Sequence, residues 1–355
     1  MTEAPGTPEP RPGLRDITPY AAPQFAVPVQ LNTNECPYPL PEGFRADLAR
    51  VVRETELNRY PDREAVGLRE ALAKHAGHDV DGTWAANGSN EVIQQLLLAY
   101  AGPGRRVALF PPTYALHERL GWIAHGELVS FRLVAPFVLG SGEIERAAAA
   151  RPAVVFVCSP NNPTGNAQPL EAVEKLAAAI PSALVIVDEA YVEFGGATAA
   201  GLVASHPNLA VVRTFSKAFA LAGARIGYCL ADPGVIDDLR RVRLPYHLSS
   251  LTQAAGLAAL RHFDDALAIL ERVRHERDRI LAGLGEIPGV DAFLSDANFV
   301  LFRPARGAVE TWQALLDRGV LVRDLSDVVP GCLRVTAGTP DEVAAFLSAL
   351  EEVLR

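Results

Sequence analysis

The sequence predicts an α/β protein in which helices cover a mainly parallel sheet, with a second, smaller α+β domain. Short and almost uniformly apolar runs recur along the chain: Arg106–Phe110, Ala153–Cys158, Leu184–Val187, Ala210–Thr214 and Gly227–Ala231. Amphipathic stretches separate several of them: Asn90–Tyr100, Leu116–Gly126 and Leu170–Ile180. Alternating strand and helix signals indicate a parallel sheet, and strands without a polar side indicate that both faces of the sheet are covered.

The smaller domain is predicted from a change of pattern after Pro245. A long, charged helical region over Ser250–Leu284 precedes three strand candidates and a final helix, namely Phe299–Phe302, Val320–Arg323, Cys332–Thr336 and Pro340–Leu354. We therefore expect four segments. They are a disordered leader over 1–17, an N-terminal segment over 18–44 that packs on the small domain and the functional site, a large domain over 45–249 and a small domain over 250–355.

Composition and charge narrow the class of protein. The chain has 355 residues and a net charge of -9, with a sequence pI of about 5.5, which argues against a nucleic-acid or anionic-membrane surface. No apolar run approaches the ~20 residues that span a bilayer, and the leader lacks the apolar stretch of a signal peptide. The four cysteines and eight histidines show no metal-ligand spacing, so we expect a cytoplasmic protein without a metal site.

The segment Arg213–Tyr228, RTFSKAFALAGARIGY, is the most informative part of the sequence. Lys217 follows an apolar strand and lies among small and apolar residues. If the segment coils, Arg225 follows about two helical turns later and converges with Ser216 and Lys217 on one phosphorylated ligand. A desolvated lysine beside another cation becomes nucleophilic, as Schiff-base chemistry requires. The competing interpretation is a buried lysine paired with a carboxylate.

Three more segments carry polar residues at strand or helix ends. Asp188 ends a buried strand and is either a helix cap or the counter-ion of a cationic ring nitrogen. Ser159–Gly165, SPNNPTG, forms a tight turn, and an asparagine held there can also donate a hydrogen bond to a phenolate. Ser89 and Asn90 open a helix, either as N-caps or as part of a phosphate site built on free N–H groups.

Taken in order, the motifs GSNE, PTY, SPNNPTG, DEAYVEF and SKAFALAGARIGY resemble those of the fold-type I pyridoxal-phosphate-dependent aminotransferases of class I/II. The resemblance extends from about Thr18 to the C-terminus. It implies that the large domain binds pyridoxal 5'-phosphate and that the enzyme is a homodimer.

The resemblance also implies roles for individual residues. Lys217 matches the catalytic lysine, which carries the cofactor as an aldimine and then moves the substrate proton. Asp188 matches the partner of the pyridine nitrogen, which keeps the ring an electron sink. The other cofactor-binding positions are Tyr114 stacked on the ring, Asn162 and Tyr191 at the 3-oxygen, Ser89, Asn90, Glu91, Ser216 and Arg225 at the phosphate end, and Tyr60 reaching the phosphate of a neighbouring subunit.

Four further motifs are similar to those of the histidinol-phosphate branch of this family: Leu31–Tyr38, Arg59–Asp62, Leu244–Ser250 and Gly331–Pro340. That branch transfers an amino group between L-histidinol phosphate and 2-oxoglutarate, giving imidazole-acetol phosphate and L-glutamate, in histidine biosynthesis. The branch usually reads Asn-Glu-Asn-Pro in the first motif, and here Cys36 replaces the second asparagine. The substrate-binding positions implied are Tyr20, Asn34, Arg323 and Arg334.

Arg323 and Arg334 give this branch a physical rationale. Two guanidinium groups can hold a dianionic phosphate through charge-assisted, bidentate hydrogen bonds. Histidinol phosphate has no α-carboxylate, so one arginine pair can bind its phosphate in one half-reaction and the glutamate α-carboxylate in the other. The competing interpretation is that Arg323 pairs with Asp324 or Asp327 at the surface.

Other functions share parts of this pattern. An aromatic amino acid (phenylalanine) aminotransferase has the same cofactor site, because an apolar pocket discriminates weakly between similar rings. A phosphate-substrate decarboxylase and a cofactor-binding regulatory module without turnover are further alternatives. A regulatory module needs a DNA-binding partner domain or a broken catalytic set, and the sequence contains neither.

Overall fold

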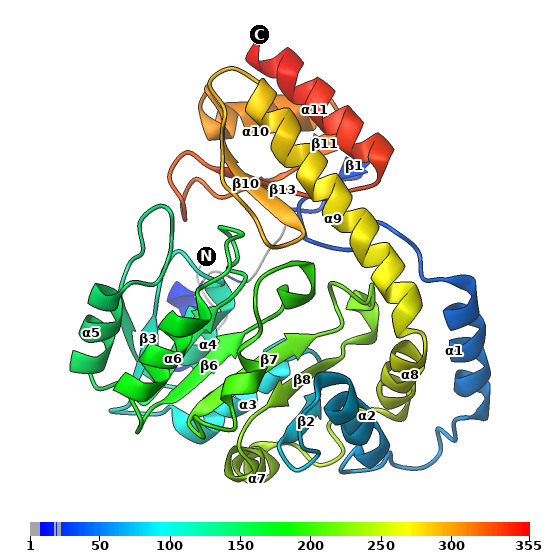
Figure 1. Cartoon of the computed structure of the whole chain (residues 1–355), viewed down its shortest axis with the longest axis vertical. Coiled ribbons are helices and arrows are strands. Elements are labelled where there is room, and N and C mark those ends of the chain that lie inside the picture. Colours follow the sequence, from blue (N-terminus) through cyan, green and yellow to red (C-terminus); the bar gives the residue numbers. More distant parts are fainter. Residues whose placement is uncertain (1–7, 18, 20–22) are drawn as a thin grey trace.

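The structure, a computed structural model, describes residues 8–17, 19 and 23–355. Within these residues a seven-stranded sheet of order β2-β8-β7-β6-β5-β3-β4 forms the centre of the larger part of the molecule (Figure 1). Its strands are β2 (Thr83–Ala86), β3 (Arg106–Leu109), β4 (Glu127–Ser130), β5 (Val154–Cys158), β6 (Leu184–Asp188), β7 (Leu209–Thr214) and β8 (Gly227–Leu230). The pairings from β4 through β7 are parallel, and β8 is antiparallel to both β7 and β2. The predicted mainly parallel sheet is therefore confirmed, with an antiparallel pair added at one edge.

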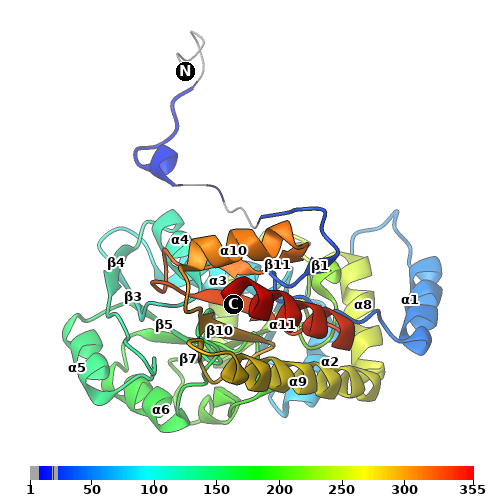
Figure 2. The same cartoon turned by 90° about the horizontal axis from the view of Figure 1, so that it is seen from above.

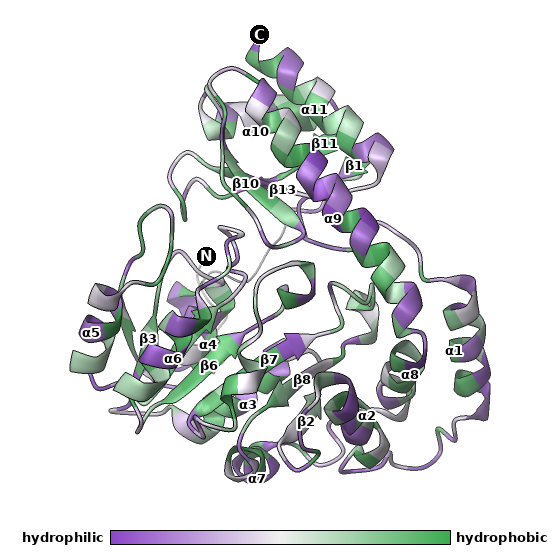
Figure 3. Cartoon of the chain, viewed as in Figure 1, coloured by the Kyte–Doolittle hydropathy of each residue, from purple (hydrophilic) through white to green (hydrophobic). Residues whose placement is uncertain are grey.

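Helices cover both faces of this sheet. Val154 and Phe156 of β5 belong to a core shared with α3, α4 and α7, whereas Val155 and Val157 face a larger core under α2, α5, α6 and α8. The helices are α1 (Glu42–Glu54), α2 (Val66–Ala76), α3 (Ser89–Tyr100), α4 (Ala115–Ile123), α5 (Ser141–Ala149), α6 (Leu170–Ala179), α7 (Pro233–Val242) and α8 (Ser250–Arg261). The central strands are accordingly mostly apolar (Figure 3), with polar residues near the carboxyl ends of β6 and β7, as expected for a sheet buried on both sides.

A smaller part of the molecule lies above this sheet and is reached by the long helix α9 (Phe263–Glu286) (Figures 1 and 2). Its antiparallel sheet has the order β12-β13-β10-β9, from β9 (Asp291–Ala292), β10 (Phe299–Arg303), β12 (Arg323–Asp324) and β13 (Leu333–Thr336). Helices α10 (Ala308–Asp317) and α11 (Pro340–Leu354) pack against each other, and α11 also packs on α9. The N-terminal segment joins this part, because β1 (Val29–Gln30) pairs in parallel with β11 (Val320–Leu321).

Two predicted elements are each divided in the structure. The helical region expected over Ser250–Leu284 is two helices, α8 and α9, with His262 between them in a non-helical conformation. The strand expected over Val320–Arg323 is also two, β11 and β12, which belong to different sheets. Apolar periodicity continues across both breaks, so periodicity alone could not locate them.

The predicted leader lies partly outside the described residues, since nothing is described before residue 8. In its described part, Leu14–Asp16 forms a short 3-10 turn, and the guanidinium of Arg11 lies 4.2 Å from the ring centroid of Trp122 in α4. In the part of the chain that is described, no helix is long and apolar enough to cross a membrane.

Gly227, at the start of β8, is where the sheet meets the N-terminus of α3. A Cβ at this position would lie 2.1 Å from the backbone nitrogen of Ser89, so the two backbones could not keep their separation. We expect Gly227→Ala to lower the free energy of unfolding by about 1–3 kcal/mol, measured by urea denaturation. Gly201→Ala is the matched control, because a Cβ at Gly201 would meet nothing within 4 Å. Equal stability of the two variants would show that the close approach is not a constraint.

Candidate active site

The predicted site residues gather where β5, β6 and β7 end. Asp188 is the last residue of β6, Lys217 follows β7 by three residues, and Asn162 lies in the turn after β5. Because these strands are parallel and adjacent, their carboxyl ends meet at one edge of the sheet. Open α/β sheets bind ligands at this edge.

Asp188 is buried and paired with a histidine that the sequence analysis missed. Nε2 of His117 lies 2.8 Å from Oδ2 of Asp188, and the imidazole stacks on Phe156 with ring centroids 4.4 Å apart. The other carboxylate oxygen accepts a hydrogen bond from the N–H of Ala190 (3.2 Å), so Asp188 does not cap an α-helix. The sequence signal that could have found His117 is its place in α4, three residues after Tyr114 of the PTY motif.

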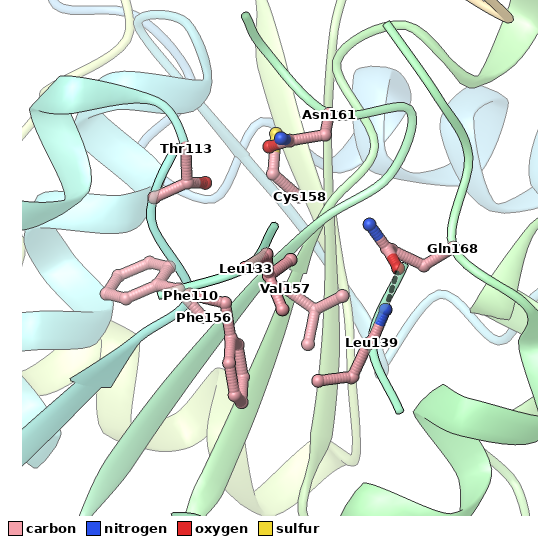
Figure 4. Close-up of a pocket in the computed structure, with 9 residues that line it drawn as sticks. All are labelled: Phe110, Thr113, Leu133, Leu139, Phe156, Val157, Cys158, Asn161 and Gln168. Carbon is pink, nitrogen blue, oxygen red and sulfur yellow. Dashed lines mark hydrogen bonds between the residues drawn. The ribbon is translucent and has the colours of Figure 1, made fainter. Parts of the chain in front are cut away.

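The two neighbouring asparagines of the SPNNPTG turn have different surroundings. Asn161 holds the turn itself, because its Nδ2 donates to the carbonyl of Pro112 (2.8 Å) and to Oγ1 of Thr164 (2.7 Å). A cavity of about 10 Å³ lies behind it and has room for about one water molecule. Its lining is mostly apolar, and the polar side chains in it belong to Asn161, Thr113 and Gln168 (Figure 4). Asn162 instead points toward the site: its Oδ1 accepts from Nη1 of Arg334 (2.6 Å), and its Nδ2 lies 3.5 Å from the hydroxyl of Tyr191.

Among the described residues, Lys217 is held by backbone carbonyls, and it forms no ion pair with a carboxylate there. Its Nζ donates to the carbonyl of Asn34 (2.9 Å) and to that of Thr33 (3.3 Å), in the N-terminal segment. The pKa of Lys217 is lowered from its usual 10.5 to about 8, chiefly by burial and then by the charge of Arg334, with a smaller contribution from Arg225 and an opposing one from Glu35. The interpretation of a lysine paired with a carboxylate is therefore wrong. An amine with this pKa is partly neutral, and hence nucleophilic, near neutral pH.

Tyr191 and Asn34 form a second buried pair beside the lysine. Nδ2 of Asn34 donates to the Tyr191 hydroxyl at 2.9 Å, and Oδ1 of Asn34 accepts from the hydroxyl of Thr336 at 3.0 Å. Burial raises the pKa of Tyr191, so its phenol keeps its proton. Asn34, predicted on the substrate side, thus connects the large sheet to β13 of the small sheet.

An anion cradle lies at the start of α3. The guanidinium of Arg225 donates to Oγ of Ser216 (3.2 Å), and it lies so close to Gly88 that a Cβ there would be 2.5 Å from Nη2. The first N–H groups of α3 lie next to that position, and a helix N-terminus favours negative charge. A hydroxyl, a guanidinium and a helix N-terminus together can hold a phosphate group.

Two local predictions about this cradle were wrong. The N-cap of α3 is Gly88, with no side-chain capping bond, so neither Ser89 nor Asn90 caps the helix. The segment after Lys217 does not coil through two turns, since its one helical piece is the 3-10 turn Ala222–Ala224. Arg225 reaches Ser216 through a left-handed backbone conformation, φ 55°, in place of helical spacing.

Arg323 and Arg334 are directly opposite each other on β12 and β13. Residues at opposed positions of antiparallel strands share a face, and like charges there repel. Nη1 of Arg323 is buried without a hydrogen-bond partner among the described residues, which also contain no ion pair of Arg323 with Asp324 or Asp327. Arg334 is buried too, with Nη2 donating to the carbonyl of Asn32 (3.1 Å). The pair forms a cationic site in which Arg334 is buried and Arg323 is half-buried.

The remaining predicted positions fall in different surroundings. Tyr114 precedes α4 and meets the His117 ring edge-on, with centroids 5.4 Å apart. Glu91 accepts from the N–H and the side-chain amide of Asn87 and so stabilises the first turn of α3. Tyr60 is 79% exposed and stacks on Tyr246. Tyr20 lies outside the described residues.

A buried lysine and carboxylate beside an anion cradle, at the carboxyl edge of an α/β sheet, define a class of enzyme that holds a phosphorylated cofactor covalently. The chain belongs to the family "Aminotransferase class I and II", which residues 26–350 match.

Several similar proteins belong to the histidinol-phosphate branch of that family. The chain is 48% identical to a histidinol-phosphate aminotransferase of Frankia casuarinae, over 97% of this chain and 90% of that protein. It is 49% identical to one of Streptomyces avermitilis, over 96% of this chain and 95% of the relative. The crystal structure of the Sinorhizobium meliloti histidinol-phosphate aminotransferase in complex with pyridoxal-5'-phosphate superimposes with a TM-score of 0.85 and 25% identity, covering 93% of this chain and 91% of that one.

The His117–Asp188 pair yields a testable prediction. His117→Phe keeps a ring on Phe156 but leaves one carboxylate oxygen of Asp188 buried without its donor. We expect the free energy of unfolding to fall by about 1.5–3 kcal/mol, the usual effect of losing a hydrogen bond to a charged group. The double variant His117→Phe/Asp188→Asn is the control, and it should recover part of the loss in a double-mutant cycle. Strictly additive effects would show that the two side chains do not interact.

Proposed function

We propose that this chain transfers the amino group between L-histidinol phosphate and 2-oxoglutarate in two half-reactions, using pyridoxal 5'-phosphate, as a step of histidine biosynthesis. The cofactor fits the described residues. Its aldehyde requires a buried amine of lowered pKa, which Lys217 supplies. Its ring nitrogen requires a buried carboxylate, which Asp188 supplies. Its phosphate requires an anion site, which the cradle at Gly88, Ser216 and Arg225 supplies. The observation that carries the substrate assignment is the opposed pair Arg323–Arg334, in which Arg334 is buried and Nη1 of Arg323 is a buried donor without a partner among the described residues.

When bound, pyridoxal phosphate supplies an electron sink for bond breaking at the substrate Cα. Asp188 supports this role by keeping a negative charge at the ring nitrogen, and His117 holds that carboxylate in place at 2.8 Å. Tyr114 would stack on the ring, and Tyr191 and Asn162 would donate to the 3-oxygen. Ser89 and Asn90 would add the N-terminus of α3 to the phosphate site, and Glu91 stabilises the first turn of that helix.

Lys217 carries the proton in each half-reaction. With a pKa of about 8 its amine is available in the neutral form that accepts a proton from Cα, and in the protonated form that returns it. The carbonyls of Thr33 and Asn34 orient the amine and accept its hydrogen bonds when it is charged. Burial excludes water, which protects the transferred proton from exchange.

The arginine pair explains why one site accepts two different amino donors. The phosphate of histidinol phosphate and the α-carboxylate of glutamate are both anions that match the fork of a guanidinium group. Asn34 lies beside Lys217 and Tyr191 and is proposed to orient the substrate together with Tyr20. Phenylalanine transamination lacks a comparable supporting observation, although phenylalanine too has a carboxylate for the pair to bind.

We further propose a homodimer in which Tyr60 reaches the phosphate of the neighbouring subunit. Support comes from the exposure of Tyr60 and Tyr246, which stack with centroids 4.4 Å apart, and of Leu57 and Leu244 nearby in sequence. Exposed apolar side chains of this size are typical of protein interfaces. A cytoplasmic location is proposed as well, in keeping with four free cysteines. The division into a large domain over 45–249 and a small domain over 250–355 stays a prediction.

Half-reaction spectroscopy on the cofactor-loaded protein tests this function. L-histidinol phosphate, L-phenylalanine and L-glutamate are added separately, and loss of the visible absorbance of the lysine-bound cofactor is followed. We expect fast conversion with histidinol phosphate and glutamate and conversion at least about tenfold slower with phenylalanine, because phenylalanine carries a single carboxylate, whereas histidinol phosphate carries a dianionic phosphate and glutamate two carboxylates.

Lys217→Ala should abolish both the visible absorbance and multiple turnover, whereas Lys175→Ala, an exposed position on α6, should change neither. A faster reaction with phenylalanine would leave the aminotransferase chemistry intact and overturn the substrate assignment.

Removing one arginine of the pair tests whether a single site holds both anions. Arg334→Gln should lower kcat/KM by about 30-fold or more, roughly 2 kcal/mol, in both half-reactions. Arg323→Gln should act in the same direction on both. Arg303→Gln, an outward-facing arginine of the same small sheet that lies 3.7 Å from Asp291, is the matched control. Loss confined to the glutamate half-reaction would show that the two anions bind in different places.

A further inference from the structure

Thr336 at the end of β13 and Asn34 in the N-terminal segment are both buried, with 3% and 1% of their surface exposed. Two hydrogen bonds join them: the backbone N–H of Asn34 donates to Oγ1 of Thr336 (3.0 Å), and the Thr336 hydroxyl lies 3.0 Å from Oδ1 of Asn34. The Asn34 amide nitrogen then contacts the Tyr191 hydroxyl at 2.9 Å. A continuous path of hydrogen bonds therefore runs from the small sheet to Tyr191.

The hydrogen bonds in this path have a consistent direction. The oxygen of Thr336 accepts from the backbone N–H of Asn34, and the Thr336 hydroxyl donates its proton to Oδ1 of Asn34. This bond favours the amide orientation with the NH₂ toward Tyr191, because the flipped amide would take the acceptor Oδ1 away from the Thr336 hydroxyl. The Tyr191 oxygen is therefore an acceptor from Asn34.

The side-chain amide of Asn162 is also directed at the Tyr191 oxygen as a donor. Its Oδ1 accepts from a guanidinium N–H of Arg334 (2.6 Å), which again can only donate, so its Nδ2 is the group directed at Tyr191, at 3.5 Å. The phenol oxygen thus accepts from Asn34 at 2.9 Å and has the amide of Asn162 as a more distant donor at 3.5 Å. Its single O–H has no acceptor among the described residues and is left to point into the site.

We propose that Thr336 is a positioning residue of the active site: its hydroxyl fixes the amide of Asn34 and thereby forces Tyr191 to donate its proton toward the 3-oxygen of the cofactor. The proposal rests on the proposed function, which places that oxygen beside Tyr191. Without the Thr336 hydroxyl, the Asn34 amide is free to flip and accept the phenol proton itself. The 3-oxygen then loses a donor that stabilises its anionic form.

The pH dependence of the visible absorbance of the cofactor-loaded protein measures this effect, because it reports the pKa of the lysine–cofactor adduct. A donor to the 3-oxygen stabilises the deprotonated adduct, so its loss raises that pKa. We expect Thr336→Val to raise the titration midpoint by about 0.5–1 unit. The charged groups around Lys217 (Arg334, Arg225 and Glu35) and the charged and titratable groups around Tyr191 (Arg334, Tyr114 and Cys158) are the same in both proteins.

Three comparisons separate this role from simple packing. Thr336→Ser keeps the hydroxyl and should restore the parent midpoint, and Thr336→Ala should shift it as Thr336→Val does if valine disturbs the fold. In a Tyr191→Phe background, Thr336→Val should cause no further shift. The proposal would be overturned if Thr336→Ser and Thr336→Val had equal titration midpoints. It would also be overturned if Thr336→Val caused the same shift in the Tyr191→Phe background as in the parent protein. A parent protein without a titrating visible absorbance would instead contradict the proposed function.

Discussion

The burial of an amine at the carboxyl edge of the sheet is the constraint on which the rest of the site depends. Lys217 has carbonyl oxygens and guanidinium groups for neighbours, so burial and positive charge both disfavour its protonated form. Its folded pKa lies below the unfolded value of 10.5. Protonated Lys217 therefore lowers the free energy of unfolding, and this effect is complete below about pH 8. The effect disappears as pH rises from about 8 to 10.5. A buried lysine with cationic neighbours lowers stability, so its position is explained by its chemistry: a nucleophilic lysine requires a buried environment that favours the neutral amine.

The sheet topology meets this constraint by reversing direction after β7. Parallel strands bring Asn162, Asp188 and Lys217 to one edge, and the antiparallel β8 then returns the chain so that Gly227 lies against the N-terminus of α3. Arg225, just before β8, is thereby brought over Gly88 and next to Ser216. The phosphate cradle thus combines two segments about 130 residues apart in the chain because one strand runs against the others.

Sequence reasoning succeeded where a signal was local. Uniformly apolar runs located the central strands to within one residue at either end, and the residues following them supplied Lys217, Asp188 and Asn162. It failed where tertiary contacts decide the outcome. The amphipathic period of α8 continues into α9 without revealing the break at His262, and the path from Lys217 to Arg225 follows a left-handed residue that no helical spacing predicts. His117 looked like any helix histidine, because its partner Asp188 is distant in sequence.

Arg334 couples the anion site to the lysine. Its charge is the second cause, after burial, of the lowered pKa of Lys217, and the same guanidinium is proposed to bind the substrate anion. An anion bound there neutralises part of the positive potential at Lys217 and raises its proton affinity. With the anion site empty, the low pKa favours the neutral, nucleophilic amine; with an anion in place, the same amine, when free, is a stronger base. By linkage, protonation of Lys217 must in turn tighten anion binding, so proton transfer and substrate retention favour each other.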